Sequence, residues 1–168
     1  MAKGNVVGDI VTIEQSALGM AGFLGSFVHA LDGKKRLTIP SEWRALTGEP
    51  PQLVVLPSVS DSDSERCLWV YPARVWNLRL APLRQVSSAD DVRRAMRVLA
   101  SRSEILTWDA AGRLRIRDEL LKHAGLTGQV MLVGAFERFE LWEPEQWKQQ
   151  ESTVDSTAMK RAVQSIGL

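Results

Sequence analysis

The stretch Asp32-Gly-Lys-Lys-Arg36-Leu37-Thr-Ile39 recurs 77 positions later as Asp109-Ala-Ala-Gly-Arg113-Leu114-Arg-Ile116. The two stretches share the skeleton Asp-x-x-x-Arg-Leu-x-Ile, and their ungapped register continues through further identities: Glu42 with Glu119, Gly48 with Gly125, and two apolar runs at 53–56 and 130–133. Each identity has a chance of roughly one in ten to twenty from ordinary amino-acid usage. Several in one register therefore indicate an internal repeat.

The composition is that of an ordinary soluble globular protein. The chain has 168 residues, of which 45% are hydrophobic and 24% charged, and its formal net charge is +1. This charge provides no bulk attraction to nucleic acid, so a nucleic-acid role must rest on locally sorted charge. The single cysteine, Cys67, excludes an intramolecular disulfide. We expect no signal peptide, no membrane-spanning segment and a cytoplasmic location.

Both copies of the repeat predict the same series of elements. Residues 27–31 alternate as in a half-buried strand, Asp32-Gly33 favours a turn, and residues 36–39 resume the extended pattern, which predicts a hairpin. Pro40 and Glu42 are typical of a first helical turn, and Gly48 is placed to end a short helix. Two strands and a further helix follow. The unit is therefore strand, turn, strand, short helix, strand, strand, helix.

The segments outside the shared register complete the predicted organisation. Ser58 to Glu65 is rich in Ser and Asp and predicts a solvated loop, and residues 88–102 predict a helix with Ser88 as its cap. A last helix is expected from about Ser156. The predicted divisions are a flexible extension (1–22), a first unit with linking helices (23–103), a second unit (104–150) and a helical tail (151–168).

Basic residues concentrate in the two predicted hairpins. Arg113, Arg115 and Arg117 are spaced by two, so in a strand their guanidinium groups would share one face. Such a row faces solvent or a polyanion, because burying unpaired charge is very costly. The first copy has Lys34 and Arg36 at the corresponding parity, with Lys35 at the turn. The pattern indicates binding to DNA.

Asp32 and Asp109 each precede an arginine by four residues. Because a carboxylate would repel phosphate, we expect each aspartate to pair with its arginine and hold the guanidinium fork in one orientation. The alternative is that each aspartate only supports its turn through a side-chain oxygen, and that each arginine is a solvated surface residue.

The sequence resembles the MraZ family from about residue 23 to 150. The resemblance rests on Phe23 to Arg44, on Asp109-Ala-Ala-Gly112-Arg113-Leu114, and on His123-Ala-Gly-Leu126, Val130-Met-Leu-Val-Gly134 and Arg138-Phe-Glu140-Leu-Trp142. It implies two tandem SpoVT/AbrB-like units in one compact, pseudo-symmetric α+β domain. It also implies a bacterial, nucleoid-associated transcriptional regulator, a repressor of the division and cell-wall gene cluster, that binds promoter direct repeats as a homo-oligomeric ring. Asp32, Arg36, Asp109 and Arg113 would be the signature residues, with the arginines facing DNA.

The sequence departs from the family pattern at three places. Lys35 stands where a glycine is expected before the first arginine, which predicts an altered turn, and Arg117 stands where the first copy has Pro40. Family members usually begin only a few residues before the first strand. Met20 would provide such a start, so residues 1–19 are expected to be mis-assigned coding sequence or a disordered arm.

Other functions find less support in the sequence. No Gly-rich phosphate loop or metal-ligand spacing is present, and neither His29 nor His123 has an acid or a nucleophile at a catalytic spacing. We therefore expect no enzyme, cofactor, metal or small-molecule substrate. Two alternatives stay open: an AbrB-type antitoxin, and an oligomeric assembly protein that does not bind DNA.

Overall fold

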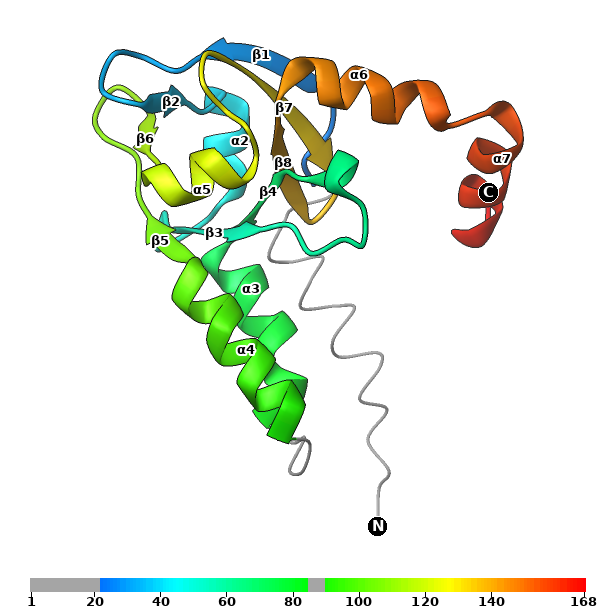
Figure 1. The fold of residues 1–168 in the computed structure, drawn as a ribbon, viewed down its shortest axis with the longest axis horizontal. Helices are drawn as coiled ribbons and strands as arrows, with labels where there is room; N and C mark the ends of the chain where they lie inside the picture. The colour runs from blue at the N-terminus through cyan, green and yellow to red at the C-terminus, as the bar shows by residue number, and fades with distance from the viewer. Residues whose placement is uncertain (1–21, 85–89) are drawn as a thin grey trace.

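The computed structural model describes residues 22–84 and 90–168, which form a mixed α+β fold (Figure 1). Its main sheet is antiparallel throughout, with the strand order β1-β7-β8-β4-β3-β5. A separate two-stranded ribbon contains β2 and β6. The strands are β1 (Ser26–Ala30), β2 (Arg36–Thr38), β3 (Leu53–Pro57), β4 (Leu68–Pro72), β5 (Glu104–Leu106), β6 (Arg113–Arg115), β7 (Gln129–Ala135) and β8 (Arg138–Trp142). The predicted α+β class is confirmed.

The two copies share one sheet: each contributes an antiparallel pair of its own, β3–β4 and β7–β8, and each outer strand pairs with the other copy. The first strand of the first copy, β1, pairs with β7 of the second copy, and β5 of the second copy pairs with β3 of the first. The prediction that β1 pairs with β2 is wrong, because β2 pairs with β6 in the ribbon. This pairing places Leu37 opposite Leu114, and both side chains are completely buried. Hydrophobic periodicity identifies extended segments but not their partners.

The two short predicted helices form at equivalent places. They are α2 (Ser41–Leu46), which follows Pro40, and α5 (Asp118–His123). Gly48 and Gly125 follow these helices with φ values of 73° and 65°, a left-handed conformation that is least costly for glycine. The helix ends predicted from the sequence are therefore confirmed in both copies.

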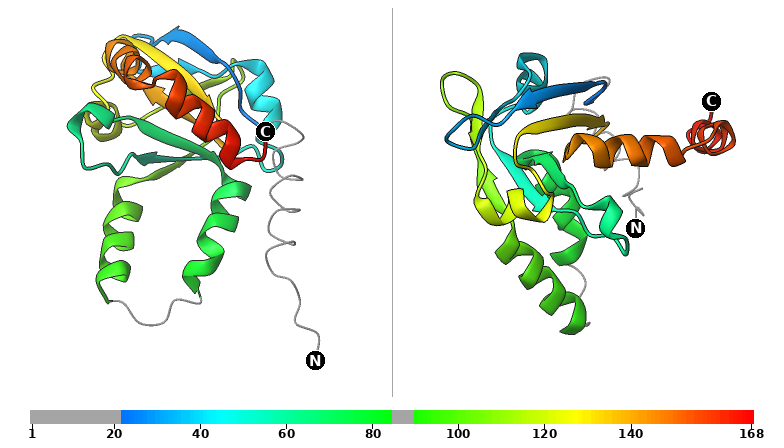
Figure 2. Two further views of the ribbon diagram at one scale, coloured as in Figure 1. Left: turned by 90° about the vertical axis from the view of Figure 1, so that its right-hand side faces the viewer. Right: turned by 45° about the horizontal axis from the view of Figure 1, so that its top comes forward.

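The longer helices extend away from the sheet. Both α3 (Ala73–Leu80), which a short 3₁₀ turn at Ala81–Arg84 follows, and α4 (Asp90–Arg102) project from the same end of the sheet (Figure 2). At the chain end, α6 (Pro144–Thr153) leads to α7 (Ser156–Ser165), which confirms the predicted last helix. A 3₁₀ turn at Asp63–Glu65 lies within the predicted polar loop. The proposed Ser88 cap and the predictions for residues 1–19 lie outside the described residues.

The hydrophobic core contains side chains from both copies. Phe23 packs edge-on against Trp43 and Phe139, with ring centroids 5.6 and 5.2 Å away. Burial of each large apolar side chain contributes about 1.5–3 kcal/mol, so a core shared by the two copies makes their folding interdependent. Within the described ranges, no helix has the length and hydropathy needed to cross a bilayer.

Candidate nucleic-acid interface

The β2–β6 ribbon has one buried face and one exposed face. Leu37 and Leu114 point into the core. Because alternate residues of a strand point to opposite sides, the flanking residues form the outer face, on which Arg36 lies opposite Arg115 and Thr38 opposite Arg113. We call these four residues the arginine face. The ribbon therefore anchors the arginine face through the two leucines.

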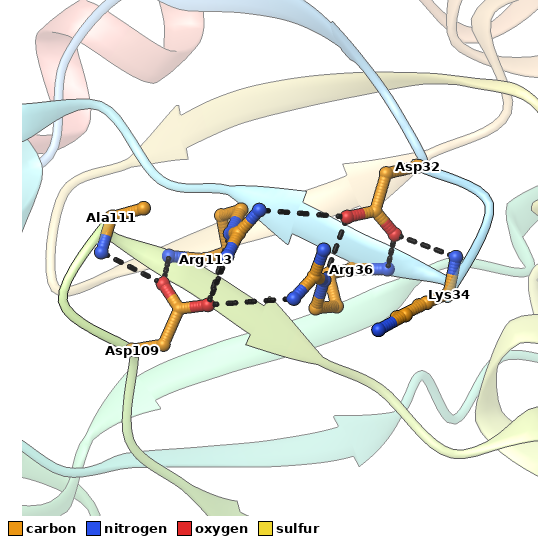
Figure 3. Close-up of polar contacts among 6 residues, drawn as sticks. All are labelled: Asp32, Lys34, Arg36, Asp109, Ala111 and Arg113. Atoms are coloured by element: carbon orange, nitrogen blue, oxygen red, sulfur yellow. Dashed lines mark hydrogen bonds and ion pairs between the residues drawn. The ribbon is translucent and has the colours of Figure 1, made fainter.

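The Asp32 carboxylate organises the first turn (Figure 3). Its Oδ1 accepts hydrogen bonds from the backbone N–H groups of Lys34 and Arg36, both at 2.9 Å. Its Oδ2 accepts a hydrogen bond from Arg36 Nε at 2.7 Å. The carboxylate thus supports the turn and holds the guanidinium group at the same time, so the two roles considered for it coexist.

The Asp109 carboxylate makes the same contacts in the second turn. Its Oδ1 accepts from the backbone N–H groups of Ala111 and Arg113 at 3.0 Å each, and its Oδ2 accepts from Arg113 Nε at 2.9 Å. The predicted carboxylate–guanidinium pairing within each copy is therefore present twice with nearly identical geometry.

Weaker contacts join the two pairs across the ribbon (Figure 3). Arg36 Nη1 lies 3.9 Å from Asp109 Oδ2, and Arg113 Nη1 lies 4.0 Å from Asp32 Oδ2. The antiparallel pairing of β2 with β6 brings these groups together from positions far apart in the sequence. Two acids and two arginines therefore form one reciprocal cluster.

Hydrogen bonds and positive charge keep both aspartates of the cluster ionised. The backbone N–H of Arg36, followed by its guanidinium group, lowers the pKa of Asp32 to about 2. The side chain of Arg113 is the main cause of the lowered pKa of Asp109, and Asp109 in turn raises the pKa of Arg113. Both aspartates and Arg113 therefore carry full charges at neutral pH.

Lys35 does not alter the first turn, contrary to prediction. It adopts a left-handed φ of 57°, and its counterpart Gly112 has a φ of 75°. The Lys35 N–H donates to the Asp32 carbonyl at 2.9 Å, as Gly112 N–H does to Asp109 at the same distance. The non-glycine residue keeps the turn because the Asp32 carboxylate fixes the surrounding backbone.

Asp118 is a site residue that the sequence reasoning did not single out. Its Oδ1 lies 3.1 Å from Lys35 Nζ and 3.2 Å from Arg115 Nη2, and the hydrogen bond from Lys35 is the main cause of its lowered pKa. Asp118 thus links a lysine of the first copy to an arginine of the second. Its place in the acidic first turn of a helix was the only sequence signal.

Arg117 and Lys34 lie at the margins of the arginine face. Lys34 is exposed at the tip of the first turn. Arg117 comes after β6, at the start of α5, where its Nη2 donates to the Ser101 carbonyl at 3.3 Å and its backbone N–H to Glu104 at 3.0 Å. The ribbon therefore contains only the first two members of the predicted arginine row, and the third is held at the end of α4.

The sequence of this chain is similar to that of one family of known proteins. A family model described as "MraZ protein, putative antitoxin-like" matches residues 101–165. A transcriptional regulator MraZ from Serratia proteamaculans is 36% identical over 129 residues, covering 76% of this chain and 84% of the relative. The proteins of the same name from Photorhabdus laumondii and Proteus mirabilis are 35% and 37% identical over 143 and 131 residues, covering 84% and 76% of this chain and 91% and 84% of the relatives. The chain belongs to the MraZ family.

Proposed function

We propose that this chain is a sequence-specific DNA-binding transcriptional regulator that uses the arginine face to contact its promoter. It acts as a repressor of the division and cell-wall gene cluster and binds direct repeats upstream of its own operon as a homo-oligomeric ring. The observation that carries the proposal is the two-stranded ribbon with buried leucines on one side and Arg36, Arg113 and Arg115 on the other.

The shape and the charge of the ribbon suit a DNA groove. The major groove of B-DNA admits a two-stranded ribbon, and an arginine fork pairs with guanine or with a phosphate through two hydrogen bonds. Five cationic side chains surround the site against three carboxylates: Lys34, Lys35, Arg36, Arg113 and Arg115 against Asp32, Asp109 and Asp118. This excess of positive charge is local to the ribbon, so a net charge of +1 for the whole chain is compatible with binding to a polyanion.

The acid–arginine cluster would pre-organise the contact. Each guanidinium group is held at its Nε edge by the aspartate of its own turn, whereas the pairs across the ribbon are long, at 3.9 and 4.0 Å. A base or phosphate acceptor would replace these long contacts while the short ones keep their orientation. Fixing the side chains beforehand lowers the entropy lost on binding.

A ring would present many such ribbons to repeated DNA sites. Each contact is small, but linked contacts raise the overall affinity because each later binding event is intramolecular. The relatives named as transcriptional regulators support this role. The proposal places the protein in the cytoplasm, on the nucleoid, with no enzymatic activity.

The test is a gel-shift titration of the full chain with the region upstream of its own operon. We expect Arg36→Ala and Arg113→Ala each to weaken binding by about 10- to 100-fold, because one bidentate arginine contact contributes about 1–3 kcal/mol. The matched control is Arg161→Ala, which removes the same charge from an exposed position on α7. It is expected to change affinity less than about twofold. Wild-type affinity in both ribbon variants would refute the proposed surface.

Salt dependence and oligomer size separate the alternatives. DNA binding through phosphate contacts weakens steeply as the salt concentration rises. A non-DNA-binding assembly protein would form the same oligomer by light scattering but would not bind the duplex. The antitoxin alternative is favoured only by the "antitoxin-like" wording of the family description. It predicts tight binding to a toxin through the tail at 151–168, and deletion of that tail would then abolish toxin binding.

A further inference from the structure

A second basic site lies away from the ribbon, between the C-terminal end of α4 and α5. It is a half-open pocket of about 480 Å³. Its lining combines polar and charged side chains with apolar ones: Pro57, Ser101, Arg102, Arg117, Glu119, Leu120 and His123. Neither Arg117 nor His123 takes part in the proposed DNA contact.

The lining of this pocket contains two arginines and one acid, and the carboxylate of Glu104 accepts the backbone N–H of Arg117 beside it. Arg102 is exposed at the end of α4, and Arg117 lies at the start of α5. Glu119 is the only acid in the lining. The Nε of Arg117 is buried and has no hydrogen-bond partner within the described part of the chain. A buried donor without an acceptor is unfavourable, so the residues around Arg117 do not fully satisfy its guanidinium group.

His123 lines the same pocket, and the positive charge of Arg102 acts on its imidazole. Its Nε2 lies 3.5 Å from Ser58 Oγ. Burial is the main cause of the lowered pKa of His123, and the positive charges of Arg66 and Arg102 lower it further. Arg66 belongs to the loop before β4, Arg102 to α4, and Glu119 and Arg117 to α5 and its N-cap. The two cationic side chains that act on the imidazole, Arg66 and Arg102, therefore lie on segments other than α5.

We propose that this pocket binds a small molecule bearing a phosphate group. Two guanidinium groups match the geometry and charge of a phosphate, and protonation of His123 on binding would add a third cation. Pro57 and Leu120 form an apolar wall for the rest of the ligand. The volume lies in the range of small-molecule sites, which is about 300–1,000 Å³. The site is independent of the proposed DNA contact, because none of its lining residues belongs to the arginine face.

The chain offers a direct spectroscopic test, because it has only two histidines. Full-length protein is titrated with inorganic pyrophosphate while the imidazole resonances are followed by NMR. We expect a saturable shift of the His123 signals, an apparent pKa of His123 raised by about 0.5–1 unit, and binding that tightens as the pH falls. His29, whose Nδ1 lies 2.6 Å from the Thr38 carbonyl oxygen, is the internal reference and should not shift.

Charge-matched variants make the test specific. Arg102→Ala and Arg117→Gln should each weaken pyrophosphate binding at least fivefold, whereas Arg161→Ala on α7 should leave it unchanged. Arg102 is exposed, so its replacement tests the site even if Arg117→Gln unfolds the protein. Three outcomes would overturn the proposal. They are the absence of a saturable His123 shift, equal shifts of both histidines, and equal weakening by Arg161→Ala, which would indicate general screening.

A parallel titration with DNA shows whether the phosphate group belongs to a small molecule or to the DNA backbone. Promoter duplex is added in place of pyrophosphate, and the same His123 signals are followed. If only the duplex shifts them, the pocket contacts the DNA backbone and the small-molecule assignment is wrong. If pyrophosphate shifts them in the Arg36→Ala variant as in the wild type, the pocket binds its ligand whether or not the ribbon binds DNA.

Discussion

The Asp32 turn and the Asp109 turn share nearly all their hydrogen bonds but differ in the residue before the arginine. In the first turn that residue is Lys35 with a φ of 57°, and in the second it is Gly112 with a φ of 75°. The carboxylates accept equivalent backbone and guanidinium hydrogen bonds in both. The comparison shows that the aspartate, and not the glycine, specifies this turn.

The surroundings of the two turns make a side chain less favourable at Gly112 than at Lys35. A Cβ added at Gly112 would lie 2.6 Å from Cζ of Arg44, whereas the Lys35 side chain is exposed and reaches Asp118. Arg44 in turn donates its Nε to the Ile39 carbonyl at 3.2 Å. The pseudo-symmetry of the two copies is therefore local, and it ends where their neighbours differ.

The largest expected effect comes from Leu37 and Leu114, an equivalent pair that is completely buried in both copies. Leu37→Ala and Leu114→Ala should each lower the free energy of unfolding by about 3 kcal/mol, because both side chains are completely buried. The measurement is urea denaturation followed by tryptophan fluorescence. Since the two leucines lie opposite each other, the double variant should lose less than the sum of the single losses. Thr38→Ala on the exposed face is the control, with a change below about 0.5 kcal/mol. A loss below about 1 kcal/mol in either leucine variant would mean that the ribbon does not anchor the core.

Exchanging the residues before the arginines should have a smaller and asymmetric effect. Gly112→Lys should destabilise the protein by about 1–2 kcal/mol, because a side chain is strained at this φ and Arg44 must move. Lys35→Gly should be nearly neutral, within about 0.5 kcal/mol, since relief of strain is offset by the greater chain entropy of glycine in the unfolded state. Thermal and urea denaturation of both variants check this. Equal destabilisation by both exchanges would contradict the difference in surroundings.

The smallest effect concerns acid pH and should have the same direction in both turns. A carboxyl group whose pKa is lowered in the folded state stabilises the fold above its ordinary pKa of about 4, and this stabilisation is lost as the pH falls. For Asp32 the loss should extend down to about pH 2, and the lowered pKa of Asp109 predicts a loss in the same direction. The melting temperatures of Asp32→Asn, Asp109→Asn and wild type are compared between pH 7 and 2. The gap between wild type and each variant should narrow below pH 4, and a constant gap would refute the role of ionisation.

The sequence predicted the acid–arginine contacts within the two turns better than it predicted the pairing of the strands. Asp32 and Arg36 lie four residues apart in one turn, so their hydrogen bonds depend on local geometry that a motif reports directly. The pairing of β1 with β7 and of β2 with β6 joins distant segments. Two copies of one pattern offer each strand chemically similar partners within its own copy or in the other, and hydrophobic alternation does not distinguish them.

Arg117 shows a second limit of the sequence. Its spacing from Arg113 and Arg115 predicts one shared face, but β6 ends at Arg115 and α5 begins at Asp118. The guanidinium group of Arg117 then donates to the backbone carbonyl of Ser101 on α4. The spacing rule applies only while the strand continues.

The repeat, the two acid–arginine turns and the short helices after them can be predicted from the residue pattern, because each depends on interactions within a few residues. Three features emerge only from the folded chain: the copies interleave in one sheet, the two acid–arginine pairs meet across the ribbon, and Arg117 and His123 line one separate pocket. These arrangements depend on which buried surfaces pack together, such as Leu37 against Leu114, and packing partners are selected by the whole core.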